Sequence, residues 1–130
     1  MELKASYKID SYKKVNAIFM ILIIAVFLYS YISRFLNFGL RSSCETLPLV
    51  YCKSRGLTRA FSQILQFEFK EALLLNPYSL KIFLFFLVQL ILRFYINSII
   101  NFNNLKLVLR LDVGFSIVFY IFCFYNLIVR

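Results

Sequence analysis

Residues 15–32 read VNAIFMILIIAVFLYSYI, and this run contains no charged side chain. As a helix with a rise of 1.5 Å per residue, it would be about 27 Å long, close to the thickness of the hydrocarbon core of a bilayer. The lysine-bearing residues 1–14 before it also fit a cleaved signal peptide, but the run is long and no A-x-A-like cleavage site follows it. We therefore predict a polar N-terminal segment over 1–14 and a first transmembrane helix over 15–32.

Two later runs have the same apolar character. PYSLKIFLFFLVQLILRFYINSII covers residues 77–100, and VGFSIVFYIFCFYNLIV covers residues 113–129. Asn76 is a favourable N-cap residue, and Pro77 suits the first helical position because its missing N–H would be unpaired there. The sequence thus predicts an all-α integral membrane protein, a single membrane domain over 1–130, with three transmembrane helices.

The overall composition also indicates a membrane protein. The chain has 130 residues, of which 62% are hydrophobic, and a soluble domain of this length has too little interior to bury so much apolar surface. The formal net charge of +9 comes from basic residues that flank the apolar runs, where they meet the anionic headgroups of the lipid bilayer. Nucleic acid is not expected as a partner, since no basic face with accessible aromatic side chains belongs to a soluble module.

Histidine is absent from the chain. Its absence removes Ser-His-Asp triads, His-ligated haem and nearly all common catalytic zinc sites, and three cysteines alone do not complete a tetrahedral zinc site. The six carboxylates are too scattered along the chain to suggest an acid–base pair. We therefore predict no catalytic residue, no metal and no cofactor, and we expect that the protein is not an enzyme.

Polar and charged residues lie within the second run and at the entrance of the third. Gln89 lies near the middle of the second run and Arg93 one turn further on, and both are costly against lipid. A short loop, 101–111, makes the two spans antiparallel, so Asp112 would lie toward the same membrane face as Arg93. One hypothesis is an ion pair between Arg93 and Asp112. The alternative is that Arg93 snorkels toward water while Asp112 caps the third helix.

The chain between the first two spans contains no apolar run long enough to cross a bilayer. Residues 33–56 contain Cys44 and Cys52, which can form a disulfide in an oxidising compartment and remain thiols in the cytoplasm. A redox-active pair is the alternative, but C-x-x-C spacing is absent, and a structural disulfide is favoured. Residues 57–75 carry apolar side chains at helical spacing in segments too short to span a bilayer, so they are predicted to form short interfacial helices.

A turn is predicted where the cysteine loop meets the first interfacial helix. Gly56 permits a backbone conformation that other residues resist, and Thr58 can cap the helix that follows. Arg59 can reach back to the carboxylate of Glu68 or Glu71, or outward to a lipid phosphate. The segment thus has two possible roles. It stabilises the fold through a turn, a helix cap and an ion-pair tether, or it is a site for a partner or an anionic ligand centred on Arg59.

The cysteine loop and the helices after it resemble a known family. The matching residues are Cys44, the run C-K-S-R-G-L-T-R-A from Cys52 to Ala60, and the pattern E-x-x-x-A-x-x-x-N-P from Glu68 to Pro77. They resemble the domain-of-unknown-function family 2752, whose pattern is a cysteine, then C-P-x-C-G-[LM]-T-R-A, a helix, G-[DE], and A-x-x-x-N-P before a membrane span. The resemblance implies a small bacterial inner-membrane protein and no established activity.

The chain departs from this family pattern at three positions. Lys53 stands at the proline, Arg55 at the second cysteine of C-P-x-C, and Phe67 at the glycine before the acidic residue. Loss of that second cysteine weakens any metal or dithiol chemistry supposed for the family.

We predict a non-enzymatic accessory, scaffolding or assembly subunit of a larger inner-membrane complex, with other membrane proteins as partners. This prediction rests on the small size of the chain, its Phe-rich spans and the polar residues within them. An oligomeric transport or channel component is the alternative, based on the polar strip of Gln89, Arg93 and Asn97. A thiol-based redox or sensor protein that uses Cys44 and Cys52 is a further one. The lysine cluster before the first run predicts a cytoplasmic N-terminus.

Overall fold

The computed structural model describes residues 2–36, 46–48, 51–101 and 103–129. These residues contain no strand. They form five helices: α1 (Glu2–Leu36), α2 (Leu57–Leu65), α3 (Phe69–Leu75), α4 (Ser79–Ile99) and α5 (Leu105–Ile128). Three of them, α1, α4 and α5, are long and apolar enough to cross a membrane. The predicted all-α fold with three transmembrane helices and short helices between the first two is therefore confirmed, and the chain is a multi-pass membrane protein.

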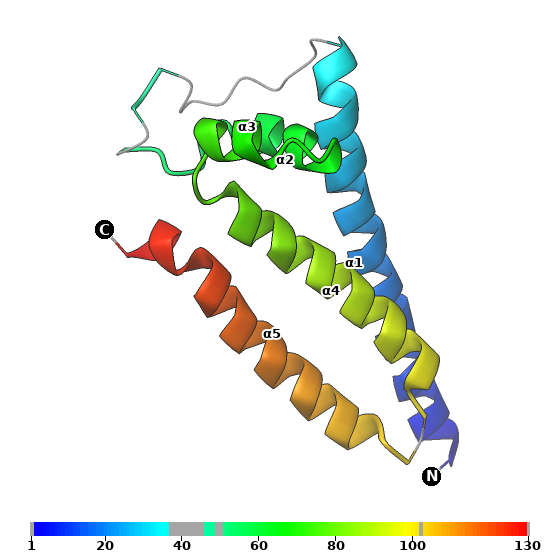
Figure 1. Ribbon diagram of the computed structural model, residues 1–130. Helices are drawn as coiled ribbons and strands as arrows, with labels where there is room; N and C mark the ends of the chain where they lie inside the picture. The colour runs from blue at the N-terminus through cyan, green and yellow to red at the C-terminus, as the bar shows by residue number, and fades with distance from the viewer. Residues whose placement is uncertain (1, 37–45, 49–50, 102, 130) are drawn as a thin grey trace.

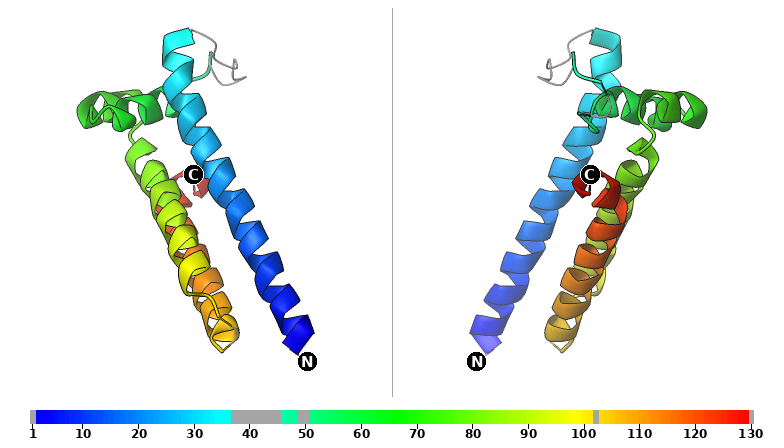
Figure 2. Two further views of the ribbon diagram at one scale, coloured as in Figure 1. Left: turned by 90° about the vertical axis from the view of Figure 1, so that its right-hand side faces the viewer. Right: turned by 90° about the vertical axis from the view of Figure 1, so that its left-hand side faces the viewer.

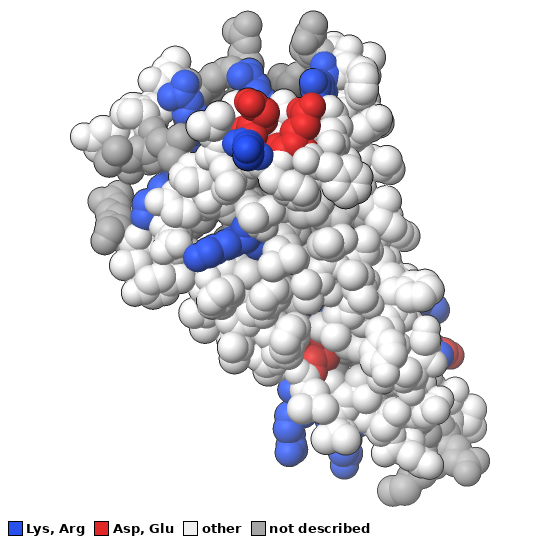
Figure 3. All heavy atoms as spheres, in the orientation of Figure 1, with Lys and Arg blue, Asp and Glu red and all other residues white. Residues whose placement is uncertain are grey.

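The three long helices form a bundle, and the two short ones lie across one end of it (Figure 1). The N-terminus lies at the opposite end, and the C-terminus lies toward the end that carries α2 and α3. Figure 2 shows the α2–α3 pair projecting sideways from the bundle. On the face drawn in Figure 3, the charged side chains lie mostly toward the two ends, with an uncharged band between them, as expected for a protein that crosses a bilayer.

Helix α1 is longer than the apolar run that predicts it. No proline or glycine occurs between Glu2 and Leu36, so nothing in the sequence ends the helix where the polar segment meets the apolar run. Its 35 residues correspond to about 52 Å, compared with roughly 30 Å of hydrocarbon core. The polar residues up to Lys14 therefore continue the helix beyond the apolar run.

Helix α4 begins two residues later than predicted. The side-chain Oδ1 of Asn76 accepts a hydrogen bond from the backbone N–H of Tyr78 at 2.9 Å, which closes a turn through Pro77. The helix then starts at Ser79, so Asn76 is not its N-cap and Pro77 is not its first residue. The sequence correctly places a helix start here but assigns the wrong local geometry to it.

The predicted loop over 101–111 is wrong for most of its length. Helix α5 begins at Leu105, about two turns before the predicted start. The residues that follow Leu105 are mainly leucine, lysine and arginine, which favour helix. Asp112 therefore lies inside α5 and cannot cap it, which excludes the capping alternative.

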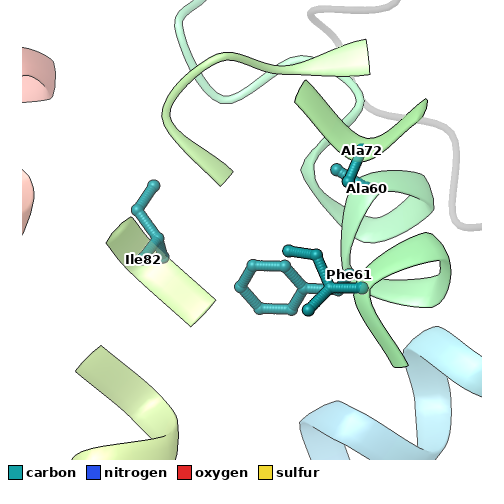
Figure 4. Close-up of a cluster of buried hydrophobic side chains, with 5 residues drawn as sticks. Ala60, Phe61, Ala72 and Ile82 are labelled. Carbon is teal, nitrogen blue, oxygen red and sulfur yellow. The ribbon is translucent and has the colours of Figure 1, made fainter. Parts of the chain in front are cut away.

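The apolar core lies where the two short helices meet the long ones. Its buried side chains are Ala60, Phe61, Ile64, Ala72 and Ile82. Figure 4 shows the ring of Phe61 directed from α2 toward Ile82 of α4, with Ala60 beside Ala72. The ring centroid of Phe61 lies 5.4 Å from that of Phe83 in α4 and 6.3 Å from that of Phe27 in α1. One aromatic side chain of α2 thus joins the first two spans.

An aromatic seam joins α4 to α5. The ring of Phe85 in α4 lies 5.7 Å from that of Phe119 and 5.3 Å from that of Phe124, measured between centroids. Tilted and edge-to-face arrangements of this kind add to the packing energy of the rings. Some of the phenylalanine side chains of these two spans therefore pack against one another within the chain.

Two residues with left-handed backbone conformations flank α2. Gly56, with φ of 75°, is its N-cap, and Phe67, with φ of 63°, lies in the turn to α3. A Cβ on Gly56 would lie 3.1 Å from the carbonyl oxygen of Leu75, so the turn predicted there needs glycine for its φ and for its space. Phe67 holds a conformation that costs a residue with a side chain about 1–2 kcal/mol. It is also the position at which the family pattern has glycine.

Thr58 does not have the predicted capping role. Because Gly56 is the N-cap of α2, Thr58 is the second residue of the helix, and the N-cap makes no side-chain hydrogen bond. The left-handed turn at Gly56 starts the helix two residues earlier than a threonine cap would.

Candidate functional site

The candidate site is a polar network between the three long helices, in the half of the bundle that contains the N-terminus. Each helix contributes a pair of polar side chains at a spacing of four residues, which places both on one face. The pairs are Tyr12 and Asn16 of α1, Gln89 and Arg93 of α4, and Asp112 and Ser116 of α5. Asn16, Gln89 and Asp112 are among the buried polar residues of the chain.

The centre of the network is the ion pair between Arg93 and Asp112. Nη1 of Arg93 donates to Oδ2 of Asp112, and the two side chains are only 15% and 3% exposed. The structure therefore has the ion pair of the first hypothesis and not a snorkelling arginine. At this burial, each charge depends on the other, because a single charge between apolar helices would be left without water or a partner.

The remaining donors of Arg93 bind neutral side chains around it. Nη1 also donates to Oδ1 of Asn16 at 3.1 Å, and Nη2 donates to Oε1 of Gln89 at 3.2 Å and to Oγ of Ser116 at 3.3 Å. The guanidinium carbon lies 5.9 Å from the ring centroid of Phe19. The planar, five-donor guanidinium can satisfy several acceptors at once in this way, which a lysine cannot.

Helix α1 joins the network through three of its residues. The hydroxyl of Tyr12 donates to Oδ2 of Asp112, and Nδ2 of Asn16 donates to Oδ1 of Asn97 at 3.2 Å. Nδ2 of Asn97 in turn reaches the backbone carbonyl of Lys13 at 3.5 Å. These bonds hold the N-terminal half of α1 against the other two spans.

A second polar cluster surrounds Asn76, a residue of the family-like motif that lies between α3 and α4. Its side chain is fully buried, and Nδ2 donates to the backbone carbonyls of Lys53 at 2.8 Å and Arg55 at 2.9 Å. Together with the bond to Tyr78, this uses both donors and the acceptor of the amide. Asn76 thus fastens the cysteine loop to the start of the second span.

Lys53 extends this link to the end of the third span. Its ammonium group donates to the carbonyl oxygens of Asn126 at 2.5 Å and Val129 at 2.7 Å. The last carbonyls of a helix have no partner within the helix, and a cation there also matches the helix dipole. The residue that departs from the family proline therefore caps α5.

Glu68, one of the two carboxylates predicted to be within reach of Arg59, lies near a basic residue of α1. The carboxylate of Glu68 lies 4.0 Å from Arg34 of α1, and Arg34 also donates to Gln63 at 3.2 Å and to Gln66. The charged side chains of Arg34 and Glu68 are 44% and 49% exposed, so this contact contributes little to stability. Arg59 is exposed on α2, and its role as a tether or ligand site stays a prediction.

The two loop cysteines are only partly covered by the structure. Cys52 is 5% exposed, whereas Cys44 lies outside the described residues. The disulfide between them therefore stays a prediction. In the described part of the chain, no group of three or more Cys, Asp or Glu side chains lies together as a metal site would require.

Comparison of the chain with protein-family models, with curated proteins and with solved structures gives no match. Membership of family 2752 therefore stays a prediction that rests on the motif. The positive φ at Phe67 gives a physical reason why a glycine would suit that position of the pattern.

Sequence reasoning singles out Gln89, Arg93 and Asp112 but misses Tyr12, Asn16 and Ser116. A usable signal is present, because Tyr12 lies four residues before Asn16 and Ser116 four residues after Asp112. Polar pairs at this spacing in or beside an apolar helix indicate a face that meets protein rather than lipid.

Proposed function

We propose that this chain is a non-enzymatic accessory, scaffolding or assembly subunit of a larger membrane complex. The observation that supports it most is the polar network. Arg93, Asp112, Gln89 and Ser116 bind one another and α1, so these four polar side chains are occupied within the chain. Side chains engaged in this way hold the helices together and do not line a polar path for a solute. The outer surface of the molecule is then the part that would contact a partner.

A surface for a partner lies at the end that carries α2 and α3. Phe67 is 81% exposed and Leu74 is 79% exposed, and Phe69 and Leu73 are exposed as well. The pair of helices lies across the end of the spans (Figure 1), where acyl chains give way to headgroups and water. Large apolar side chains at that level are the residues that a neighbouring membrane subunit would cover.

The strained backbone at Phe67 fits this proposal. A phenylalanine with positive φ persists where its side chain is useful, since glycine would relieve the strain. The ring of Phe67 lies 6.3 Å from that of Phe69 between centroids, and together they form an aromatic edge. We propose that this edge anchors the partner, and that the complex lies in the bacterial inner membrane with the N-terminus of the chain in the cytoplasm.

The variant Phe67→Gly distinguishes a structural role of Phe67 from a role in anchoring the partner. It is expected to raise the free energy of unfolding of the isolated protein by about 0.5–1 kcal/mol, because glycine accepts the left-handed conformation. The same variant is expected to lose a larger membrane protein that copurifies with the natural chain at fixed stoichiometry from native membranes. Unfolding in mild detergent measures the first effect, and quantitative mass spectrometry of the pull-down measures the second.

Phe94→Ala is the matched control, because Phe94 is a similarly exposed aromatic on α4, 69% exposed, away from α2 and α3. It should retain the partner. A Phe67→Gly protein that keeps the partner would contradict the anchoring role. A natural chain that purifies only with copies of itself would contradict the accessory function and favour the transport alternative.

A further inference from the structure

An open hollow lies on one face of α5, near its first residue. Its volume is about 480 Å³, and it is lined by Lys106, Leu109, Arg110, Val113 and Gly114. These residues follow one another at helical spacing, so they form a single stripe along the helix. Both cations of the stripe lie in its first part, with Leu109 between them, and Val113 and Gly114 continue it toward the middle of the span.

Gly114 has no packing role within the described chain. Only proline is less favourable than glycine in a helix interior, and the chain has just three glycines. A Cβ built on Gly114 meets nothing within 4 Å, in contrast to Gly56, where a Cβ would lie against a carbonyl oxygen. No neighbouring helix of the described structure therefore requires the missing side chain, and the space it leaves is open to a molecule from outside.

The cations at the start of the stripe identify the chemistry of that molecule. Lys106 and Arg110 are exposed and lie one turn apart, so both can reach one anionic group. They precede the apolar run 113–129, and basic residues that flank such a run are expected at the level of the lipid headgroups. An amphiphile with an anionic head and an apolar chain matches this order of side chains.

We infer that the stripe is a binding site for an anionic phospholipid. Lys106 and Arg110 bind the phosphate, and an acyl chain lies along Val113 and over the flat surface at Gly114. A second copy of the chain fits less well, because the same end of the bundle carries a lysine cluster on α1 and would bring like charge toward the stripe.

Native mass spectrometry of delipidated protein in mild detergent, titrated with phosphatidylglycerol and separately with phosphatidylcholine, tests the site. The natural chain is expected to bind phosphatidylglycerol more tightly. Lys106→Gln combined with Arg110→Gln is expected to weaken phosphatidylglycerol binding roughly ten-fold or more, from the contribution of each basic residue near an anionic headgroup. Lys4→Gln with Lys14→Gln removes the same charge from exposed positions of α1 at the same end and should have little effect.

Gly114→Leu tests the apolar part of the site without weakening the fold. Leucine favours helix more than glycine, so the unfolding temperature should stay the same or rise, while both lipids should bind more weakly. Val118→Leu, at an exposed position one turn further along, is the control for added bulk. Equal phosphatidylglycerol binding by the natural chain and by either stripe variant would overturn the inference. So would loss of a dimer, rather than of lipid, in Gly114→Leu.

Discussion

Arg93→Leu is expected to destabilise the protein by about 3–5 kcal/mol, because it leaves the carboxylate of Asp112 buried without its cation. Asp112 is only 3% exposed at its side chain, so water cannot replace the lost partner. The midpoint of unfolding in mild detergent measures the effect. Lys14→Leu removes a cation from an exposed position of α1 and should change the stability by less than about 0.5 kcal/mol.

The double variant Arg93→Leu with Asp112→Leu is expected to recover most of this loss. Replacement of both members of a buried ion pair by apolar residues is often close to neutral, whereas removal of one member is not. The difference between the double variant and the two single ones gives the coupling energy of the pair. A double variant no more stable than Arg93→Leu would show that the pair does not hold the network together.

Asn76→Asp is expected to cost about 3 kcal/mol or more. The change removes the two donors that bind the carbonyls of Lys53 and Arg55 and places a carboxylate against those oxygens in a fully buried position. It should also loosen the end of α5, because Lys53 caps that helix. Unfolding in detergent measures the cost, and faster hydrogen exchange in the last turn of α5 reports the loosened cap.

Asn103→Asp is the matched control for this variant, since Asn103 is exposed in the connection between α4 and α5. It makes the same chemical change outside any buried cluster and should leave both measurements nearly unchanged. A similarly small effect of Asn76→Asp would mean that the cysteine loop is held by other contacts.

The spans could be predicted from the sequence because they depend on local properties. The apolar runs are long enough to cross a bilayer, and the number and order of the spans follow from them. The first residues of the helices were harder to predict from the sequence. The start of α5 depends on eight residues of mixed character before Val113, and the start of α4 depends on which backbone group the side chain of Asn76 binds.

The polar network could be predicted only in part. The sequence order and the short connection bring Arg93 and Asp112 to the same membrane face, so their pairing can be predicted from the topology of the spans. Tyr12 reaches Asp112 across a separation of 100 residues, and that contact depends on how α1 packs against the other two spans. Asn76 likewise lies 23 residues from the carbonyl of Lys53 that it binds, a tertiary role that a local capping rule cannot reveal.

The polar network joins α1 to α4 and α5 within the membrane. A photo-crosslinking benzoyl-phenylalanine at Tyr12, activated in native membranes and located by mass spectrometry of the digested protein, tests it most directly. The structure predicts an intramolecular crosslink to the part of α5 that contains Asp112. The same group at Tyr7, which is 74% exposed, should give no such crosslink. Crosslinks from position 12 to lipid alone, or to another protein in place of α5, would contradict the account.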